Sequence, residues 1–288
     1  MTQLLSNPEP VKPEQIQEDI HDPDLIVDEL DISHLVIEDD KPVDNFQSAQ
    51  QQRLLVDALC SSKVIPAPFL AEANVGLFYT LKGDPIVPDM LLSLGVQRAN
   101  DFSDRRNRSY FVWELGKVPD VCIEIISNRE GDEISLSSKS RQKGRIRTKK
   151  DIYSHIGVPF YVVFDPLQQL QGETEMNGAL VRVWTMVSGR QVELTDRLGL
   201  QQQGQWIWLE AIGLGLTLWE GCFEEDIPRR WLRWCDRQGQ VIPTGAEGME
   251  IQRQSAEAEK QRAEAEKQRA DRLAERLRAL GINPDEET

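Results

Sequence analysis

The amino-acid sequence predicts a domain of mixed α and β class (a mixed sheet with flanking helices), followed by a β-rich segment and a long charged helix. Short apolar runs bounded by Pro, Gly and Asp alternate with stretches of helical spacing between residues 46 and 220. One run, Phe160–Phe164, is apolar throughout, as expected for a strand buried on both faces of a sheet. The predicted parts are an acidic tail over residues 1–45, a folded domain over residues 46–245 and a charged helix over residues 246–281.

The acidic character of the chain is concentrated at its N-terminus. The sequence carries a formal net charge of -15, and residues 1–50 hold 13 acidic and 2 basic side chains. Such a segment is typical of a solvated, disordered tail. Its apolar patches Leu25–Val27 and Leu35–Ile37 leave docking as an alternative, and masking of a basic surface is another. Since the rest of the chain is close to neutral, the total charge does not exclude a polyanionic substrate.

The first half of the predicted domain contains one helix and several strands. Apolar residues at helical spacing, including Leu54, Leu55 and Leu59, predict a helix over residues 45–61. The Asp84-Pro85 pair separates the first strand from the second. The predicted strands are Phe69–Thr80, Met90–Val96, Tyr110–Glu114 and Val121–Ile126.

The second half is predicted to contain a helix and then further strands. Helical spacing covers Lys139–Ile156 and ends at Gly157, just before the buried strand. Val181–Val187 alternates between apolar and polar residues, and Ser188-Gly189 is typical of a hairpin turn. Two Trp-rich runs predict the last strands, and their aromatic side chains are expected in the core. These runs are Trp206–Leu209 and Leu214–Trp219.

A seven-residue repeat predicts the C-terminal helix. The sequence AEAEKQR occurs twice, at residues 256–262 and 263–269. The leucines of Leu273–Leu280 add a short apolar seam, and Gly281 marks the end of the helix. Because the seam is only alanine before Leu273, a strong coiled coil is not expected. A solvated single helix and a weak oligomerisation helix both fit this pattern.

Composition excludes several other kinds of site. The four cysteines are far apart and contain no Cys-x-x-Cys, which argues against a disulfide framework and a zinc module. Buried thiols in a reducing cytoplasm are expected instead. The three histidines do not cluster, and no apolar run reaches the roughly 18 residues of a membrane span. A cytoplasmic protein without a membrane segment or signal peptide is therefore predicted.

Two carboxylates at strands indicate a metal site. Asp89 follows a proline at the start of one predicted strand, and Glu124 interrupts the apolar run Val121–Ile126. A carboxylate in such a run is costly unless it is paired or bound to a cation. The ordinary alternatives are a turn role for Asp89 and a buried arginine partner for Glu124. If the two carboxylates converge, Mg²⁺ or Mn²⁺ suits them, and a nearby lysine would complete a phosphodiester-cleaving site.

A strongly basic segment lies close to these carboxylates in the sequence. Residues 139–150 hold seven basic side chains and no acid. The segment fits a solvated loop, a patch that tracks phosphates beside the site, or a partner of the acidic tail. The candidate nucleic-acid-binding side chains are Lys139, Arg141, Lys143, Arg145, Arg147 and Lys150, with Arg105, Arg106 and Arg108 as further candidates.

Four ordered motifs then point to a known family. They are Pro88-Asp89, Pro119-Asp120 followed by V-C-I-E-I-I-S, Lys149-x-x-x-Tyr153, and the run from Gly157 to Pro166. In order and spacing they resemble the Uma-type family, restriction-endonuclease-like proteins of the PD-(D/E)XK nuclease superfamily. The resemblance covers residues 46–220. It implies a restriction-endonuclease-like core with the site at one end of a small mixed sheet, and metal-dependent cleavage of DNA.

The resemblance also implies roles for individual residues. It makes Asp89 and Glu124 the catalytic carboxylates and metal ligands, with the backbone carbonyl of Ile125 as a third ligand. It makes Lys149 the catalytic amine, with Lys150 as the fallback. DNA is the implied substrate, and a second copy of the chain, bound through the nuclease domain or the C-terminal helix, is the other expected partner.

The sequence departs from the family pattern in three places. Ile126 occupies the position, two residues after the glutamate, where the superfamily normally has its lysine. The connection over residues 127–148 is longer than usual, and Gln51-Gln52 stands where the first helix often has His-Gln. A non-catalytic binding or assembly protein with a degenerate site is therefore the alternative function.

Overall fold

The computed structural model describes residues 45–129, 131–136, 144, 146–195 and 199–280. The chain divides into two units, Met1–His34 and Leu35–Thr288, and every described residue lies in the second. All but the last residue of the predicted acidic tail lies outside the described residues, so its predicted disorder stays a prediction.

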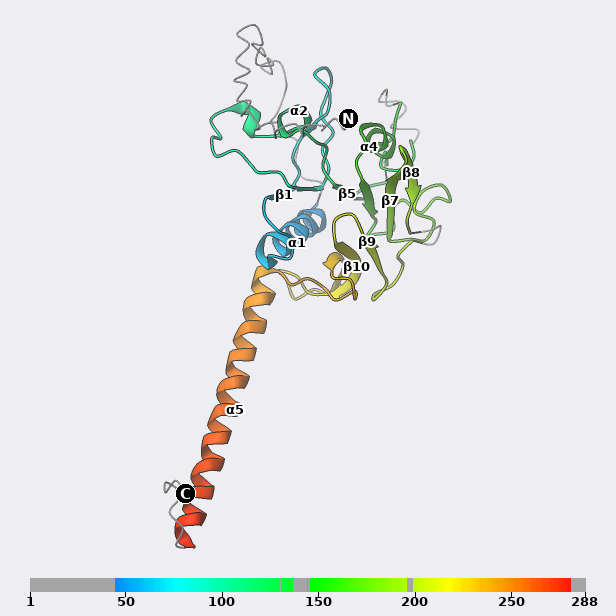
Figure 1. The fold of residues 1–288 in the computed structure, drawn as a ribbon. Coiled ribbons are helices and arrows are strands. Elements are labelled where there is room, and N and C mark those ends of the chain that lie inside the picture. The colour runs from blue at the N-terminus through cyan, green and yellow to red at the C-terminus, as the bar shows by residue number, and fades with distance from the viewer. Residues whose placement is uncertain (1–44, 130, 137–143, 145, 196–198, 281–288) are drawn as a thin grey trace, which may run out of the picture. The chain divides into compact units, whose positions relative to one another are not determined.

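A six-stranded mixed sheet forms the centre of the fold (Figure 1). The strand order is β1-β3-β5-β6-β7-β8, in which β5 and β6 run parallel and the other neighbours run antiparallel. The predicted mixed α and β class is confirmed. The strands are β1 Phe69–Ala73, β3 Met90–Leu94, β5 Val121–Ile125, β6 Phe160–Phe164, β7 Val181–Val187 and β8 Arg190–Glu193.

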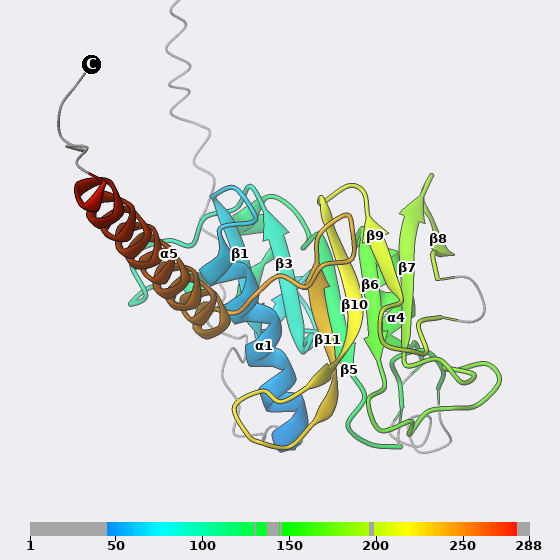
Figure 2. The ribbon, with the colours of Figure 1, turned by 90° about the horizontal axis from the view of Figure 1, so that it is seen from below.

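One face of this sheet is covered by helix α1 (Phe46–Ser62) and by a second, antiparallel sheet (Figure 2). The second sheet has the order β11-β10-β9 and contains the two predicted Trp-rich strands together with β11, which was not predicted; the other predicted strand of the β-rich region, Val181–Val187, belongs to the central sheet. The indole Nε1 of Trp234 donates to the backbone oxygen of Leu55 at 3.0 Å and so joins it to α1. The strands are β9 Trp206–Leu209, β10 Leu214–Gly221 and β11 Arg229–Cys235.

Helix α4 (Lys149–Ile156) lies over the opposite face. Successive residues of a strand point to opposite faces. In β5, Ile123 and Ile125 therefore belong to the core under α1, whereas Cys122 belongs to the core under α4. Glu124 shares the α4 side with Cys122 by the same alternation.

Several predicted strand bounds are wrong. The run Phe69–Thr80 is not one strand, because Asn74, with φ 59°, ends β1 before the short strand β2 (Leu77–Phe78). Tyr110–Glu114 is not one strand either: Tyr110–Phe111 forms β4, parallel to β2, and Val112–Leu115 forms helix α2. A short 3-10 helix, η1, precedes β4 at Arg105–Asn107. β3 ends at Leu94, two residues before the predicted end.

Of the helix predicted over Lys139–Ile156, the structure shows the part Lys149–Ile156 as α4, and residues 139–143 and 145 lie outside the described residues. Thr148 caps it: its hydroxyl accepts from the backbone nitrogen of Asp151, and the Asp151 side chain accepts from the Thr148 nitrogen. The described residues just before the helix, 144 and 146–148, are not helical. Gly157, with φ 82°, ends the helix as predicted.

The predicted C-terminal helix is confirmed as α5, Gly245–Ala279. Its first turn is anchored by Arg233, which is 1% exposed and binds both carboxylate oxygens of Glu247. From Gln252 to Ala279 nearly all its side chains are exposed, as expected for a solvated helix. In the part of the chain that the structure describes, no helix combines the length and apolarity needed to cross a membrane.

The cysteines differ from expectation in part. Cys122 and Cys235 are buried thiols as predicted, but Cys60 and Cys222 are exposed. None of the four forms a disulfide.

Candidate active site

Glu124 is a buried carboxylate with two partners from one helix. Its side chain is 1% exposed. Lys149 Nζ lies 2.6 Å from Oε2, and the Tyr153 hydroxyl donates to Oε1 at 2.7 Å. The buried arginine considered from sequence is therefore not its partner; a lysine and a tyrosine take that place.

The start of α4 brings these two partners to the strand. Lys149 and Tyr153 are four residues apart and lie on one face of the helix. The backbone nitrogens of Lys149 and Lys150 donate to the backbone oxygens of Asp132 and Glu133, at 2.7 and 3.0 Å. These bonds fix the first turn of the helix, so its first side chain reaches the buried carboxylate.

Lys150, the fallback amine, points elsewhere. Its Nζ lies 4.6 Å from the ring centroid of Trp184, on β7. The two lysines are thus separated in role: Lys149 contacts Glu124, and Lys150 packs on an indole.

Asp89 is the second carboxylate of the site. It lies just before β3, and the register pairs Met90 with Ile123, which brings Asp89 beside the end of β5. Its Oδ2 accepts from the Ile125 backbone nitrogen at 2.6 Å, and its Oδ1 accepts from Gln52 Nε2 at 2.8 Å. Asp89 therefore lies across from Glu124 at the end of the β3–β5 pair, near enough for its charge to raise the pKa of Glu124.

Ile125 contributes only through its backbone. Its side chain is 3% exposed and packs in the core on the α1 side. Its N–H holds Asp89, which leaves the carbonyl as the one group of Ile125 that could bind a cation.

Charge and burial act in opposite directions on the two ends of the ion pair. Burial, assisted by the charge of Asp89, raises the pKa of Glu124 to about 8 against the opposing effect of Lys149. Burial alone would lower the pKa of Lys149, but the carboxylates of Glu124, Asp89 and Glu133 outweigh it and raise that pKa. The site therefore holds a protonated amine beside a carboxyl that is still gaining its charge near neutral pH.

The predicted basic patch is only partly described. Arg147 is exposed, and Lys150 is half-buried against Trp184. The other four candidates, Lys139, Arg141, Lys143 and Arg145, lie outside the described residues.

Two functional side chains had no assigned role from the sequence. Gln52, which holds Asp89, was noted only as part of the Gln51-Gln52 pair, and Tyr153 only as a motif letter. The sequence signal for Gln52 was a run of polar residues on the buried side of α1, because a helix face that packs against a core is normally apolar. For Tyr153 it was the four-residue spacing from Lys149.

Comparison of the chain with family models, with curated proteins and with solved structures finds no match. Asp89, Glu124 and Lys149 form the group of side chains whose geometry bears on function. Paired carboxylates beside a held ammonium can bind a divalent cation and neutralise charge on a phosphate.

Proposed function

We propose that this chain is a metal-dependent nuclease of the Uma type that hydrolyses phosphodiester bonds of DNA. The observation that carries the proposal is the 2.6 Å contact of Lys149 with Glu124. It puts an amine from α4 at the carboxylate of β5, although the strand has Ile126 where the superfamily has its lysine. Asp89, bonded to the residue after Glu124, supplies the second carboxylate.

The donor set fits Mg²⁺ or Mn²⁺. Mg²⁺ is usually held by one or two carboxylates, with water and substrate phosphate completing the shell. Asp89 and Glu124 provide that number, and the Ile125 carbonyl is a candidate third ligand. Within the described ranges no three His, Cys, Asp or Glu side chains form a metal-binding group, so a site closed by the protein, as structural zinc requires, does not fit. When bound, the ion would lower the pKa of a water and offset phosphate charge.

The protein side chains divide the remaining work. Lys149, held protonated, donates to a phosphate oxygen whose charge grows in the transition state. Gln52 and Tyr153 are positioning residues, because each fixes one oxygen of a carboxylate.

Plasmid nicking tests the proposal. The wild-type protein should convert supercoiled plasmid to the nicked form with Mg²⁺ or Mn²⁺ and not with EDTA. Asp89→Ala and Glu124→Ala should both be inactive. If both variants cut as well as wild type, the activity does not belong to this site.

A second candidate function is a non-catalytic binding or assembly protein. The same Lys149–Glu124 pair favours it, because each group already satisfies the other without a cation. Calorimetric titration with Mg²⁺ discriminates the two functions. Clear binding that Glu124→Ala abolishes contradicts a degenerate site, whereas no binding to folded protein contradicts the nuclease.

Affinity for Mg²⁺ should rise with pH. A cation needs Glu124 ionised, and the pKa of this carboxyl in the folded protein is about 8. Below that pH the ion must displace a proton, so the association constant should rise by up to roughly tenfold per pH unit and level off above about 8. Titrations at pH 6, 7, 8 and 9 measure it. A profile that is flat across this range would contradict Glu124 as a ligand.

Two adjacent glutamines provide a matched test of Asp89 positioning. Gln52→Ala removes the bond to Asp89 and should weaken Mg²⁺ binding about 10–100-fold. Gln51→Ala removes two bonds to the backbone of Leu232, at 2.8 and 2.9 Å, and should lower stability with Mg²⁺ affinity kept. Calorimetry and urea unfolding of both variants separate these effects. Equal Mg²⁺ affinity of Gln52→Ala and wild type would show that the bond is not needed.

We place the activity in a reducing cytoplasm, because all four cysteines are free thiols. DNA is the proposed substrate. A second copy, bound through the nuclease domain or α5, is the other proposed partner, and light scattering of the full chain tests it.

A further inference from the structure

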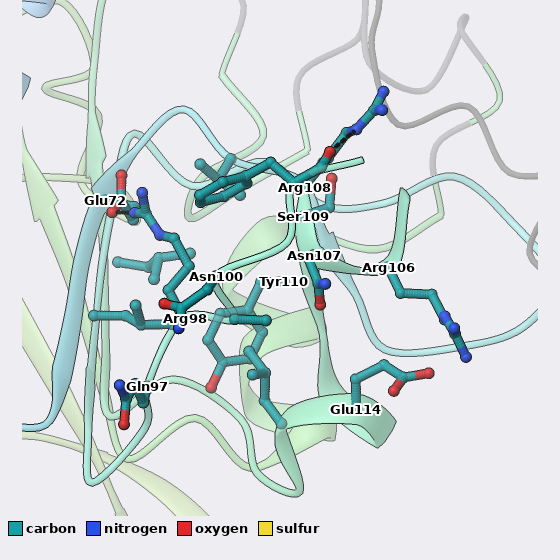
Figure 3. Close-up of a pocket in the computed structure, with 16 residues that line it drawn as sticks. Glu72, Gln97, Arg98, Asn100, Arg106, Asn107, Arg108, Ser109, Tyr110 and Glu114 are labelled. Carbon is teal, nitrogen blue, oxygen red and sulfur yellow. Dashed lines mark hydrogen bonds and ion pairs between the residues drawn. The ribbon is translucent and has the colours of Figure 1, made fainter. Parts of the chain in front are cut away.

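A pocket with both polar and apolar lining opens between β3 and the loop that follows it. Its volume is about 860 Å³, and loop residues 97–109 supply much of its lining (Figure 3). Leu91 also lines it and lies two residues after Asp89 in the chain. On the neighbouring segment, Val75 lines the pocket, and the backbone nitrogen of Asn74 donates to the Asp89 backbone oxygen at 3.2 Å. The pocket is thus a direct neighbour of the proposed catalytic site.

The lining combines a flat apolar surface with amides. Phe102 is 49% exposed, and the guanidinium of Arg98 lies 5.7 Å from its ring centroid. Arg98 is held by an ion pair with Glu72. The amides of Gln97 and Asn100 are exposed and have no hydrogen-bond partner among the described residues, so each offers a donor and an acceptor. Stacking on aromatic or guanidinium planes and pairing with Asn or Gln are how proteins bind nucleobases.

Two arginines of the same loop, Arg106 and Arg108, lie at the edge of the pocket. In Figure 3 the guanidinium groups of Arg106 and Arg108 extend away from the centre of the pocket. Arg106 donates to both oxygens of Asp104, and Arg108 Nε donates to the backbone oxygen of Phe102 at 2.8 Å. Residues 97–109 contain four arginines and two aspartates, an excess of positive charge that suits phosphate contacts.

We infer that this pocket binds one unpaired nucleobase of a DNA strand whose neighbouring phosphate lies at Asp89 and Glu124. The inference rests on the proposed nuclease function and adds a base-binding subsite to it. Gln97, Asn100 and Phe102 contact the base, and Arg106 and Arg108 contact the backbone outside. A base stacked in a duplex cannot enter a pocket of this kind, so the strand is single or locally opened at this nucleotide.

Equilibrium binding in EDTA tests the subsite without cleavage. A fluorescein-labelled single strand of six nucleotides is titrated with wild type, with Gln97→Ala/Asn100→Ala and with Phe102→Ala, and fluorescence anisotropy is measured. Both variants should bind about 5- to 100-fold more weakly than wild type. The control Gln202→Ala/Gln203→Ala, which removes two exposed amides from another loop, should bind as wild type does. Equal affinity of the pocket variants and wild type would overturn the inference.

Two further measurements identify the contact as one with a base. Each nucleotide of the strand is replaced in turn by an abasic site, and the affinity of wild type and of Gln97→Ala/Asn100→Ala is measured. At one position the abasic site should weaken binding by wild type as much as the double substitution does. At that position it should not weaken binding by the double variant any further. Losses that add at every position would overturn the inference. Salt dependence should be unchanged in the amide variant and reduced by about one ion each in Arg106→Ala and Arg108→Ala.

The two proposals can fail separately. A protein that binds through the pocket but never nicks DNA refutes the nuclease and keeps the base site. A protein that nicks DNA with unaltered binding by the pocket variants refutes the base site alone.

Discussion

Replacing Lys149 with methionine should destabilise the fold by up to about 3–5 kcal/mol at high pH, because the buried Glu124 carboxylate has no cation once it is ionised. Glu124 is 1% exposed and the Lys149 side chain 24%. Methionine keeps most of the aliphatic stem, so the lost interaction is mainly the charge. Urea unfolding followed by tryptophan fluorescence at pH 8, 9 and 10 measures the difference, which should be small at pH 8, where Glu124 is only partly ionised, and should grow above it.

The size of this loss should depend on pH in a defined direction. The pKa of Glu124 is raised in the folded protein, so the folded state holds its proton to higher pH than the unfolded state does. A raised pKa of this carboxyl lowers the free energy of unfolding. This loss is absent below about pH 4.5, grows as pH rises, and is complete above the pKa of Glu124 in the folded protein. Without Lys149 the folded pKa rises further, and the variant should approach wild-type stability near pH 5.

A double-mutant cycle assigns the effect to the pair. Lys149→Met/Glu124→Gln should recover most of the stability, because the amide still accepts from Tyr153 and leaves no buried charge. Lys150→Met is the matched control on the same helical turn, and its packing on Trp184 should be largely kept. If Lys149→Met is as stable as wild type at pH 10, the ion pair does not hold the site together.

The carboxylates of the site could be located from sequence because each breaks a local pattern. Glu124 interrupts an apolar strand, and Asp89 follows a proline at a strand start. The alternation of a strand also places Glu124 on one face. Both patterns involve only a few neighbouring residues, so they can be recognised from the sequence alone.

The partners of the carboxylates could not be located in this way. Gln52 is 37 residues from Asp89, and Lys149 is 25 residues from Glu124. Periodicity indicates which face of a helix is buried, but it does not say which strand end that face meets. The resemblance proposed Lys149; its bond to Asp132, in a segment longer than the family pattern, is what fixes the helix start.

The wrong strand at Tyr110–Glu114 has a related cause. Its aromatic and β-branched residues favour a strand. In the structure Gly116, with φ 73°, ends a single helical turn that begins at Val112, so the pairing with β2 stops at Phe111. The helical turn that ends at Gly116 thus overrides the strand propensity of these residues.

The three site side chains should matter far more for cleavage than two matched control residues, Asp120 and Lys150. Asp89→Asn, Glu124→Gln and Lys149→Gln should each lower kcat/KM for Mg²⁺-dependent nicking by at least about 10²–10³-fold. Asp120→Asn is the control for Asp89, since Asp120 also follows a proline but bonds to Lys117 and to the Leu94 nitrogen. Lys150→Gln is the control for Lys149. Both controls should stay within a few-fold of wild type when circular dichroism shows that they are folded.

The pH profile of Lys149→Gln separates the two ways in which this lysine can act. If the amine only keeps Glu124 ionised, activity of the variant should return as pH rises past the increased pKa of the carboxyl. If the amine also donates to the phosphate, as we propose, a deficit of about 10²–10³-fold should persist at high pH, because no other group replaces that donor. Full recovery at high pH would make Lys149 a positioning residue. An equal loss in Lys150→Gln would instead move the catalytic amine to its neighbour.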